Sequence, residues 1–319
     1  MTLLIPDLFA ADSPMPTRRT VATIGVFDGV HLGHQRLIGE TVCLARERDA
    51  ASLAIVFHPR PREVLRPELP PDYLSPLDER LDAIGRLGVD LVARLRFDAG
   101  VAALSAEEFV GVLVERYHLA GLCVGPDFAL GRNRAGTVDY LRALGERRGF
   151  TVATVDPLTV GGQVVSSTAI RRLLAEGEVG EAAALLGRPF ALSGEVVRGF
   201  GRGRTIGLPT ANVAIGEKLA VPANGVYAVR CALDSATGAA LSLPGVANIG
   251  HRPTFDSGVR SLEVHLLDFA GDLYGTKLRV VFVARLRSET RFGSPDAFLE
   301  QIGRDIAGAR VLLGEPARV

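Results

Sequence analysis

The chain has almost no lysine and no excess of either charge. Of its 36 basic residues only Lys218 and Lys277 are lysine, and neither lies in the sequence G-K-[ST]. A P-loop is therefore excluded, and any phosphate chemistry has to use arginine, histidine, a metal ion and backbone N–H groups. Because the formal net charge is zero, no overall field attracts nucleic acid or an anionic membrane surface. Neither class of partner is expected.

Cysteine is scarce, and long apolar runs are missing. Cys43, Cys123 and Cys231 are isolated and lack the spacing of metal ligands, which predicts reduced core residues. No apolar run is long enough to cross a membrane. The short apolar run at the N-terminus contains Pro6 and Asp7 and has its arginines after it, the reverse of the order in a signal peptide. The sequence therefore predicts a cytoplasmic protein.

The first 186 residues alternate between short apolar runs and amphipathic stretches. This alternation predicts a parallel sheet wrapped by helices on both faces. Ligands of such sheets bind beyond the carboxyl ends of the strands, where the turn before His31, the proline-rich loop 58–76 and the loop 125–136 fall. Strands are expected at 21–27, 53–57, 91–95, 121–125 and 152–155, and helices from about His31 and at 77–87, 105–118 and 138–148.

The pattern changes after Pro189. Short runs rich in strand-forming residues follow, separated by turns that carry glycine and proline, and they predict an antiparallel barrel or sandwich. Ser294-Pro295 opens a final helix that extends to about Leu313. A chain of 319 residues is long enough for two domains, expected at 1–186 and 187–319. The expected strands of the second domain are 192–197, 211–215, 226–233, 241–249, 261–267 and 278–286.

The stretch from Thr23 to His34 reads T-I-G-V-F-D-G-V-H-L-G-H and joins a predicted strand to a predicted helix. His31 and His34 lie in the first turn of that helix and share one face, while Gly29 and Gly33 let another molecule approach the backbone. A helix start offers free N–H groups and the positive end of a dipole, which bind phosphate. A lone histidine here would be an ordinary capping or core residue. The pair, with glycines on both sides, predicts a nucleoside triphosphate site.

Two more stretches fall at the strand ends of the first domain. S-S-T-A-I-R places Ser167 and Thr168 at a helix start and Arg171 one turn in, and this is phosphate-binding chemistry. Taken alone, it indicates no more than an N-cap followed by a surface arginine. The loop 125–136 carries Asp127 and a basic tip, and alone it is only a long loop.

The second domain carries a glycine-rich stretch at 199–207, G-F-G-R-G-R-T-I-G, followed by L-P-T-A-N. Such a loop can surround a phosphate with backbone N–H groups and needs no lysine. Thr210 and Asn212 alternate onto one face of the following strand and offer two neutral oxygens, which suit a Mg²⁺ ion that keeps its phosphates and waters. The alternative is an ordinary turn followed by a strand.

Several motifs carry a resemblance to a known family. The run G-x-F-D-G-x-H-x-G-H at 25–34 resembles the nucleotidylyltransferase superfamily, and as a whole one branch of it, the bacterial bifunctional riboflavin kinases/FAD synthetases. S-S-T-x-I-R is similar to the superfamily's second nucleotide motif, and G-x-D-F-x-L-G at 125–131 to the family's flavin and nucleotide loop. P-T-A-N after G-R-x-x-G, and E-V-H-L-L-D-F at 263–269, resemble riboflavin kinase. The resemblance covers nearly all of residues 21–311.

The resemblance implies a Rossmann-like α/β nucleotidylyltransferase domain followed by an antiparallel β-barrel riboflavin kinase domain with a C-terminal helix. It implies a transferase with two activities, which phosphorylates riboflavin with ATP to FMN and then adenylylates FMN with ATP to FAD and pyrophosphate. The implied substrates are riboflavin, FMN and ATP, with Mg²⁺ bridging phosphates. Whether the chain is a monomer or a homo-oligomer stays open.

The same resemblance assigns the site residues. For adenylyl transfer it places the catalytic role on His31 and His34, and the nucleotide contacts on Gly25, Phe27, Asp28, Gly29, Gly33, Ser167, Thr168 and Arg171. For the kinase it places the nucleotide contacts on Gly201, Gly203, Arg204, Gly207 and Pro209, the metal ligands at Thr210 and Asn212, and the catalytic base at Glu263. Flavin contacts are expected from Arg60, Asp127 and Arg291.

Elementary chemistry asks for one carboxylate base rather than two. The phosphate of FMN is already an anion, so adenylyl transfer needs only alignment and neutralisation of charge on the leaving pyrophosphate. The ribityl hydroxyl of riboflavin is a poor nucleophile, and its phosphorylation benefits from a carboxylate that accepts the proton. Glu263 and His265 face one way on the predicted strand. Without the resemblance, an outward polar stripe explains them equally well.

Three positions depart from the family pattern. Val26 stands where asparagine is usual, Arg60 where histidine is usual between two prolines, and Leu130 where an aromatic residue is usual. Val26 removes an amide contact, Arg60 offers phosphate a forked cation in place of a neutral donor, and Leu130 weakens stacking on a ring. They motivate one alternative, a riboflavin kinase with a weakened or inactive adenylyltransferase domain. The other alternative is a non-catalytic flavin-binding regulator, and the intact H-x-G-H, P-T-A-N and Glu263 argue against it.

Overall fold

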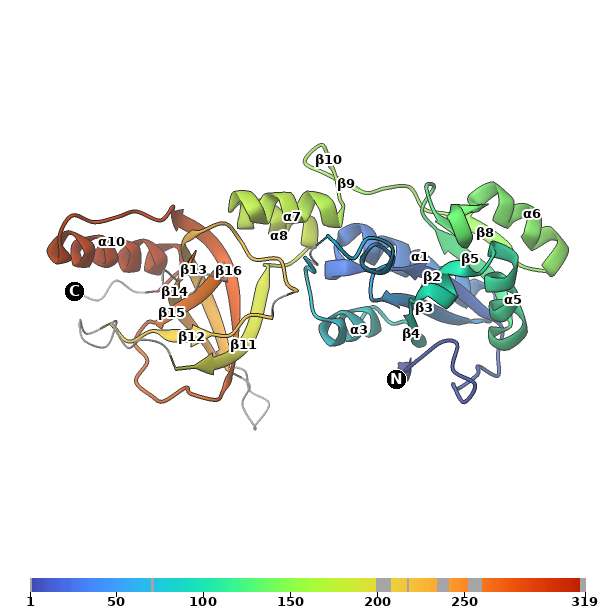
Figure 1. Ribbon diagram of the computed structural model, residues 1–319, viewed down its shortest axis with the longest axis horizontal. Helices are drawn as coiled ribbons and strands as arrows, with labels where there is room; N and C mark the ends of the chain where they lie inside the picture. The colour runs from blue at the N-terminus through green and yellow to red at the C-terminus, as the bar shows by residue number, and fades with distance from the viewer. Residues whose placement is uncertain are drawn as a thin grey trace. The chain divides into compact units, whose positions relative to one another are not determined.

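The computed structural model describes residues 2–69, 72–198, 208–216, 218–233, 241–251 and 260–315. The chain divides into two compact units, Met1–Ser167 and Thr168–Val319, and each is built around its own sheet (Figure 1). Among the described residues, no helix combines the length and the apolarity that crossing a bilayer requires.

The first unit contains a six-stranded sheet in the order β1-β4-β3-β2-β5-β8. All neighbouring strands are parallel, which confirms the α/β fold expected from the alternating sequence. The strands are β1 (Leu3–Ile5), β2 (Thr20–Gly25), β3 (Ala51–His58), β4 (Leu91–Arg96), β5 (Leu119–Val124) and β8 (Thr151–Thr154). The helices are α1 (Leu32–Glu47), α2 (Pro61–Leu65), α3 (Leu77–Gly85), α4 (Ala99–Ala103), α5 (Ala106–Tyr117) and α6 (Val138–Arg148).

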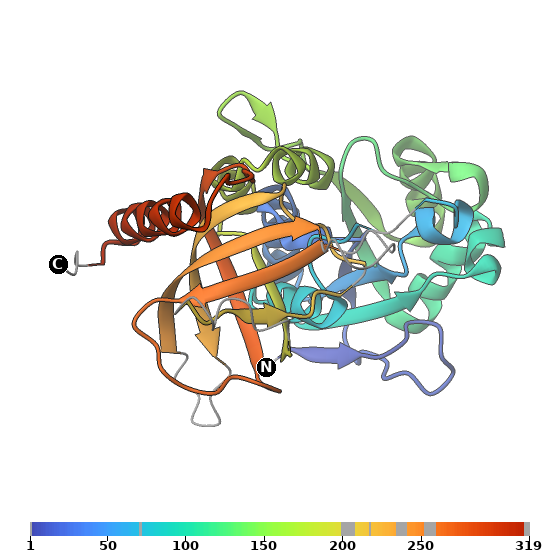
Figure 2. The ribbon, with the colours of Figure 1, turned by 60° about the vertical axis from the view of Figure 1, so that its left-hand side comes forward.

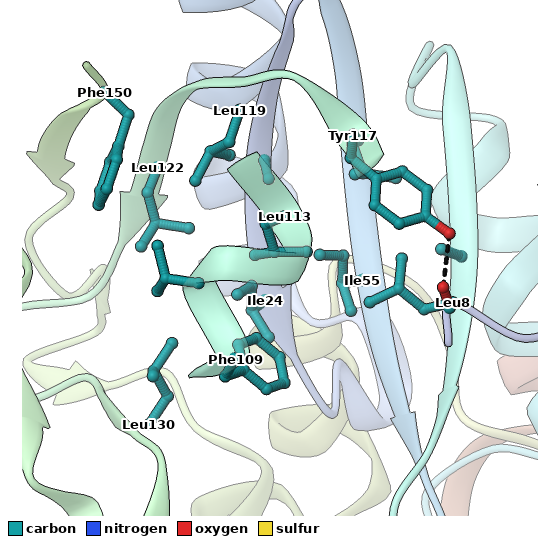
Figure 3. Packing of buried hydrophobic residues seen from close by; sticks show 14 of the residues in the cluster. Leu8, Ile24, Ile55, Phe109, Leu113, Tyr117, Leu119, Leu122, Leu130 and Phe150 are labelled. Atoms are coloured by element: carbon teal, nitrogen blue, oxygen red, sulfur yellow. Dashed lines mark hydrogen bonds between the residues drawn. The ribbon is translucent and has the colours of Figure 1, made fainter. Parts of the chain in front are cut away.

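Alternate residues of the strands face opposite layers of helices. On β3, Leu53 and Ile55 pack in a cluster with α5 and α6, whereas Val56 packs in a cluster with α1 and α3. Figure 3 shows the first cluster, where the hydroxyl of Tyr117 donates a hydrogen bond to the carbonyl of Leu8 at 2.6 Å. Because helices cover both faces, ligands approach this sheet at the carboxyl ends of its strands.

The structure differs from the expected elements at the edge of the sheet and in the proline-rich loop. β1 adds an edge strand beside β4 that the sequence did not predict. The loop expected over 58–76 contains the short helix α2, whose first position is Pro61. Proline suits that position because the missing N–H has no intrahelical partner there in any case. Two small hairpins complete the unit, β6 (Ala129–Leu130) with β7 (Gly136–Thr137) and β9 (Thr159–Val160) with β10 (Gln163–Val164).

The second unit contains a closed antiparallel barrel in the order β11-β12-β15-β14-β13-β16. The sequence left a barrel and a sandwich open, and the structure selects the barrel. Helix α10 (Pro295–Leu313) packs on it through Ala309 and Leu313 (Figure 2). The strands are β11 (Ala191–Val197), β12 (Ala211–Val213), β13 (Gly225–Leu233), β14 (Leu241–His251), β15 (Arg260–Leu266) and β16 (Lys277–Arg287).

Helices α7 (Ser167–Glu176) and α8 (Val179–Leu186) pack with the barrel. The N–H of Ala223 donates to the carbonyl of Leu174 at 2.8 Å, and Nη1 of Arg285 donates to the carbonyl of Glu176 at 3.1 Å. The compact unit therefore begins at Thr168, ahead of the predicted domain start at 187. Where the two activities divide along the chain stays a prediction.

Two candidate active sites

The first site is the turn between β2 and α1. Phe27, Gly29 and Val30 have φ values of 51°, 77° and 43°, a left-handed conformation that only glycine adopts without strain. Strain of this kind persists where the surrounding structure enforces it, which is often at functional sites. Asp28 of this turn is buried, and its carboxylate accepts the N–H of Leu74 at 2.8 Å.

The two histidines of this turn lie against each other. His31 caps α1, and its Nδ1 accepts the N–H of His34 at 3.3 Å. The two rings stack with centroids 3.5 Å apart, and the ring of Phe27 meets His34 edge-on at 5.3 Å. A Cβ at Gly33 would lie 3.3 Å from the ring of His31, and one at Gly25 would lie 3.1 Å from the ring of Phe27. Both glycines thus make room for the rings of the site.

His34 is held in its neutral form. Its pKa lies well below the ordinary value of 6.5 because burial disfavours the imidazolium, and because the charges of His31 and Arg80 add to that effect. Its Nδ1 has no hydrogen-bond partner among the described residues. A neutral imidazole can donate one N–H to a phosphate oxygen without carrying a charge of its own.

The S-S-T sequence reaches this turn through its second serine. The hydroxyl of Ser167, at the first residue of α7, donates to the carbonyl of Asp28 at 3.0 Å. Thr168 is exposed and Arg171 is half-buried, and both belong to the second unit. Their predicted contacts with nucleotide remain predictions.

Arg60 is buried and occupied by acidic neighbours. Its guanidinium lies 2.9 Å from Asp72, 3.4 Å from Glu63 and 3.9 Å from Asp28, and 4.1 Å above the ring of Tyr73. In this structure the side chain ties the proline-rich loop to the turn. Its predicted contact with flavin remains a prediction.

The loop 125–136 forms a hollow of about 360 Å³ at the strand ends. Asp127 and Phe128 line it, and Nη2 of Arg134 donates to the carbonyl of Asp127 at 3.1 Å. Leu130, in contrast, is buried in the core of the sheet and does not line the hollow. Its departure from the family pattern therefore changes the core, and Phe128 is the aromatic side chain that a ring in this hollow would meet.

Arg80 is the residue of this site that the sequence did not reveal. It lies on α3, is fully buried, and its Nη1 donates to the carbonyl of Val26 at 3.0 Å. The signal was present, because Arg80 stands between Leu77 and Ile84, in the helix stripe where an apolar residue is expected. An arginine in the apolar stripe of a helix, next to a phosphate motif, indicates a buried residue that belongs to the site.

The second site lies on the barrel. Glu263 on β15 is paired in register with Asn212 on β12 and with Asn248 on β14. Along β15, Glu263 and His265 are half-buried and alternate with buried apolar residues, as the sequence predicted. Nδ1 of His265 lies 2.9 Å from the carbonyl of Pro209, and this contact fixes the segment that precedes β12.

A cavity of about 270 Å³ separates this face of the barrel from α10. Its polar lining consists of Thr210, Asn248, Glu263, His265, Arg287, Glu289, Thr290 and Asp305. The apolar wall consists of Leu208, Val226, Val246, Phe292, Phe298, Ile302 and Ile306.

A second hollow of about 510 Å³ adjoins the first at Thr210, which lines both. Pro209 and Asn212 belong to its wall, together with the segment 269–274. The described residues contain no cluster of three histidine, cysteine or acidic side chains that could hold a metal ion by themselves. The neutral oxygens of Thr210 and Asn212 suit a Mg²⁺ ion that arrives with nucleotide phosphates.

Some predicted residues do not enter this geometry. Gly201, Gly203, Arg204 and Gly207 lie outside the described residues. Arg291 is exposed, and it lines neither hollow. The arginine that lines the cavity is Arg287, whose guanidinium pairs with Asp305 of α10 at 2.8 Å.

The two sites define a two-part nucleotide-dependent transferase, with a histidine-bearing turn on a parallel sheet and a carboxylate-bearing barrel. The model of the FAD synthetase family matches residues 13–169, and that of the riboflavin kinase family matches residues 186–313. The chain belongs to the family of bifunctional riboflavin kinases/FMN adenylyltransferases.

Similar proteins cover nearly the whole chain. The bifunctional riboflavin kinase/FMN adenylyltransferase of Pseudomonas fluorescens is 44% identical over 94% of this chain and 95% of its own. The protein of the same description from Escherichia coli K12 is 42% identical over 95% of both chains. A crystal structure titled macrolide-efflux protein from Streptococcus pneumoniae superposes with a TM-score of 0.86 at 31% identity, over 97% of this chain and 98% of that one.

Proposed function

We propose that the barrel of this chain converts riboflavin and ATP to FMN, and that the turn between β2 and α1 then adenylylates FMN to FAD. The observation that carries the proposal is the position of Glu263. It stands on the wall of a cavity, in register between two asparagines of neighbouring strands. A carboxylate on the wall of a largely apolar cavity that adjoins a second hollow suits proton abstraction from a hydroxyl that is being phosphorylated.

In the kinase reaction the apolar cavity takes the flavin ring and the larger hollow takes ATP. Thr210 lines both, so the ribityl hydroxyl and the γ-phosphate meet beside it. Glu263 accepts the proton of the hydroxyl while the oxygen attacks phosphorus and ADP leaves. Thr210 and Asn212 would hold Mg²⁺, which supplies charge neutralisation on the phosphates when it is bound.

In the adenylyltransferase reaction no base is needed, because the phosphate of FMN is already ionised. Its oxygen attacks the α-phosphorus of ATP, and pyrophosphate leaves. His31, His34 and the N–H groups at the start of α1 bind the leaving phosphates. The neutral state of His34 suits this role, since the ring donates a hydrogen bond while remaining uncharged.

The further partners follow the same reasoning. We propose Mg²⁺ as the metal, because two neutral oxygens and nucleotide phosphates are its preferred surroundings. We also propose that the protein works in the cytoplasm without nucleic acid, since its three cysteines are free and its formal net charge is zero. Whether it forms a homo-oligomer is left open.

One experiment tests the proposal directly. The protein is incubated with riboflavin, ATP and Mg²⁺, and the flavins are separated by chromatography. We expect FAD. Accumulation of FMN alone would favour a kinase with an inactive first site, the reading that Val26 and Arg60 motivate. No conversion would overturn the proposed function and leave a flavin-binding regulator.

A further inference from the structure

Arg80 is a buried cation that makes no close ion pair among the described residues. Its side chain is 1% exposed, and its Nε also lacks a hydrogen-bond partner within the same residues. Burying a charge in this way is unfavourable unless something else balances it, and burial accordingly lowers the pKa of Arg80. Among the described residues Asp28, Tyr73 and Glu63 favour the charged form, but burial outweighs them.

The other two nitrogens of Arg80 donate hydrogen bonds to backbone carbonyls, one of them in the turn. Nη1 donates to the carbonyl of Val26 at 3.0 Å, and Nη2 donates to the carbonyl of Ser75 at 3.3 Å. The hydroxyl of Ser75 in turn accepts the N–H of Gly29 at 3.3 Å. Arg80 thus braces the turn directly at Val26 and, through Ser75, at Gly29. A lysine could not do this, because it lacks the fork that reaches two carbonyls at once.

The charge of Arg80 acts on the catalytic histidine. It is one of the causes, after burial and His31, that lower the pKa of His34. The other charged or titratable groups nearby act on Arg80 itself: Asp28, Tyr73, Arg60 and Glu63. Asp28 is already bound to the N–H of Leu74, and the Tyr73 ring lies 4.9 Å from the guanidinium carbon.

We propose that Arg80 is a positioning residue for adenylyl transfer, which shapes the turn 26–30 through Val26 and Ser75 and acts on the ring of His34. The inference rests on the proposed adenylyltransferase function of this site.

The test compares Arg80→Met with Arg80→Lys and with a matched control, Arg116→Met. Arg116 is also an arginine of the first unit that binds two backbone carbonyls, those of Phe9 and Ala10, and lies 6.0 Å from a tyrosine ring. We expect Arg80→Met to lower kcat for FAD formation roughly 10²-fold. The KM for FMN should stay within about twofold, because FMN does not touch Arg80. Arg116→Met should leave kcat near wild type.

A second readout separates positioning from a merely structural role. The ring of His34 is titrated by NMR in the protein without substrates. In Arg80→Met its pKa should rise toward the ordinary value, so protonation and the acid limb of the pH–rate profile should move to higher pH. Arg80→Lys keeps the charge and should restore the pH profile but not kcat.

An unchanged His34 titration in Arg80→Met, or a wild-type kcat, would overturn the proposal. Near-ultraviolet circular dichroism shows whether Arg80→Met folds. If it does not, Arg80→Lys tests the proposal: a wild-type pH profile with a lowered kcat supports it, and a wild-type kcat contradicts it. The titration needs no turnover, so it tests the effect of Arg80 on His34 even if the wild type forms no FAD. Absence of FAD in the wild type would instead count against the proposed function.

Discussion

Glu263 lies on the half-buried face of β15, between Asn212 and Asn248 in the neighbouring strands. A glutamate on an outward face of a strand is usually a solvated residue. Here the same face forms the wall of a cavity that is also lined by α10, as a residue that meets a ligand would require.

Changing Glu263 to Gln tests this residue. The substitution keeps the shape of the side chain but removes the carboxylate that accepts the ribityl proton. Kinase turnover should fall roughly 10²–10⁴-fold, with little change in flavin binding. Adenylylation of supplied FMN should persist. Glu195→Gln, at an exposed position of β11, is the control. A Glu263→Gln protein that still makes FMN at the wild-type rate would remove Glu263 from the mechanism.

His34 predicts how stability depends on pH. Its pKa in the folded protein lies well below the ordinary value of 6.5, so the unfolded chain binds a proton more readily. Stability from this residue is present above about pH 6.5 and is lost as the pH falls below that value toward the folded pKa. In urea unfolding, His34→Gln should flatten the pH dependence of the first unit below pH 6.5, whereas His118→Asn, at an exposed helix end, should not. Parallel curves for both variants would contradict the prediction.

At the scale of elements, helix α10 lines one side of the cavity that we propose for the flavin. The guanidinium of Arg287 at the end of β16 makes three contacts of 2.8–3.0 Å with the carboxylate of Asp305. Asp305 is buried and also accepts from Nε2 of Gln301 at 2.9 Å. The pair fixes the helix across the apolar wall that Phe298 and Ile302 provide.

Replacing Asp305 with Asn should loosen this helix. Breaking one side of a partly buried pair leaves Arg287 without its counter-ion, and we expect a loss of about 1–2 kcal/mol in unfolding free energy, less than for a fully buried pair. The KM for riboflavin should rise roughly tenfold, which corresponds to about 1.4 kcal/mol of binding. Glu300→Gln breaks an exposed pair on the same helix and should change stability by no more than about 0.5 kcal/mol. Equal effects of the two changes would refute the role of Arg287–Asp305.

Elements whose signal is local were predictable from the sequence. Helix α6 was expected and found at 138–148, and the capping box of Ser105 is present with both of its hydrogen bonds. The predicted bounds of the barrel strands lie close to the observed ones, because each strand is a run of strand formers between turns. β1 was not predicted, since three residues carry too little pattern. Nor was the role of Arg80, because sequence does not show which carbonyls a buried side chain will reach.

At the scale of the whole molecule, the packing of α7 and α8 decides where the chain can be cut. A fragment of residues 187–319 loses both helices and uncovers the surface that Leu173, Leu174, Leu185 and Leu186 cover. A fragment of residues 168–319 retains them. Both fragments should make FMN and no FAD, because the H-x-G-H turn is absent from each.

The longer fragment should be the more stable one. We expect its Tm to exceed that of 187–319 by about 3 °C or more, since loss of roughly 1 kcal/mol shifts Tm by about 2–4 °C in a domain of about 150 residues. Thermal unfolding followed by circular dichroism measures the difference. Equal Tm values would show that α7 and α8 do not support the barrel, and FAD formation by either fragment would refute the division of activities.

Closure of the barrel has a consequence for how the enzyme family can diversify. In a closed barrel no strand can change register without breaking the pairing with its neighbours. The alignment of Glu263 with Asn212 and Asn248 is therefore fixed by the barrel as a whole. Helix α10 carries no such constraint, and Phe298 and Ile302 face the same cavity from it. Substitutions on one helix can thus reshape part of the cavity, while the alignment of Glu263 with its neighbours stays fixed in the strands.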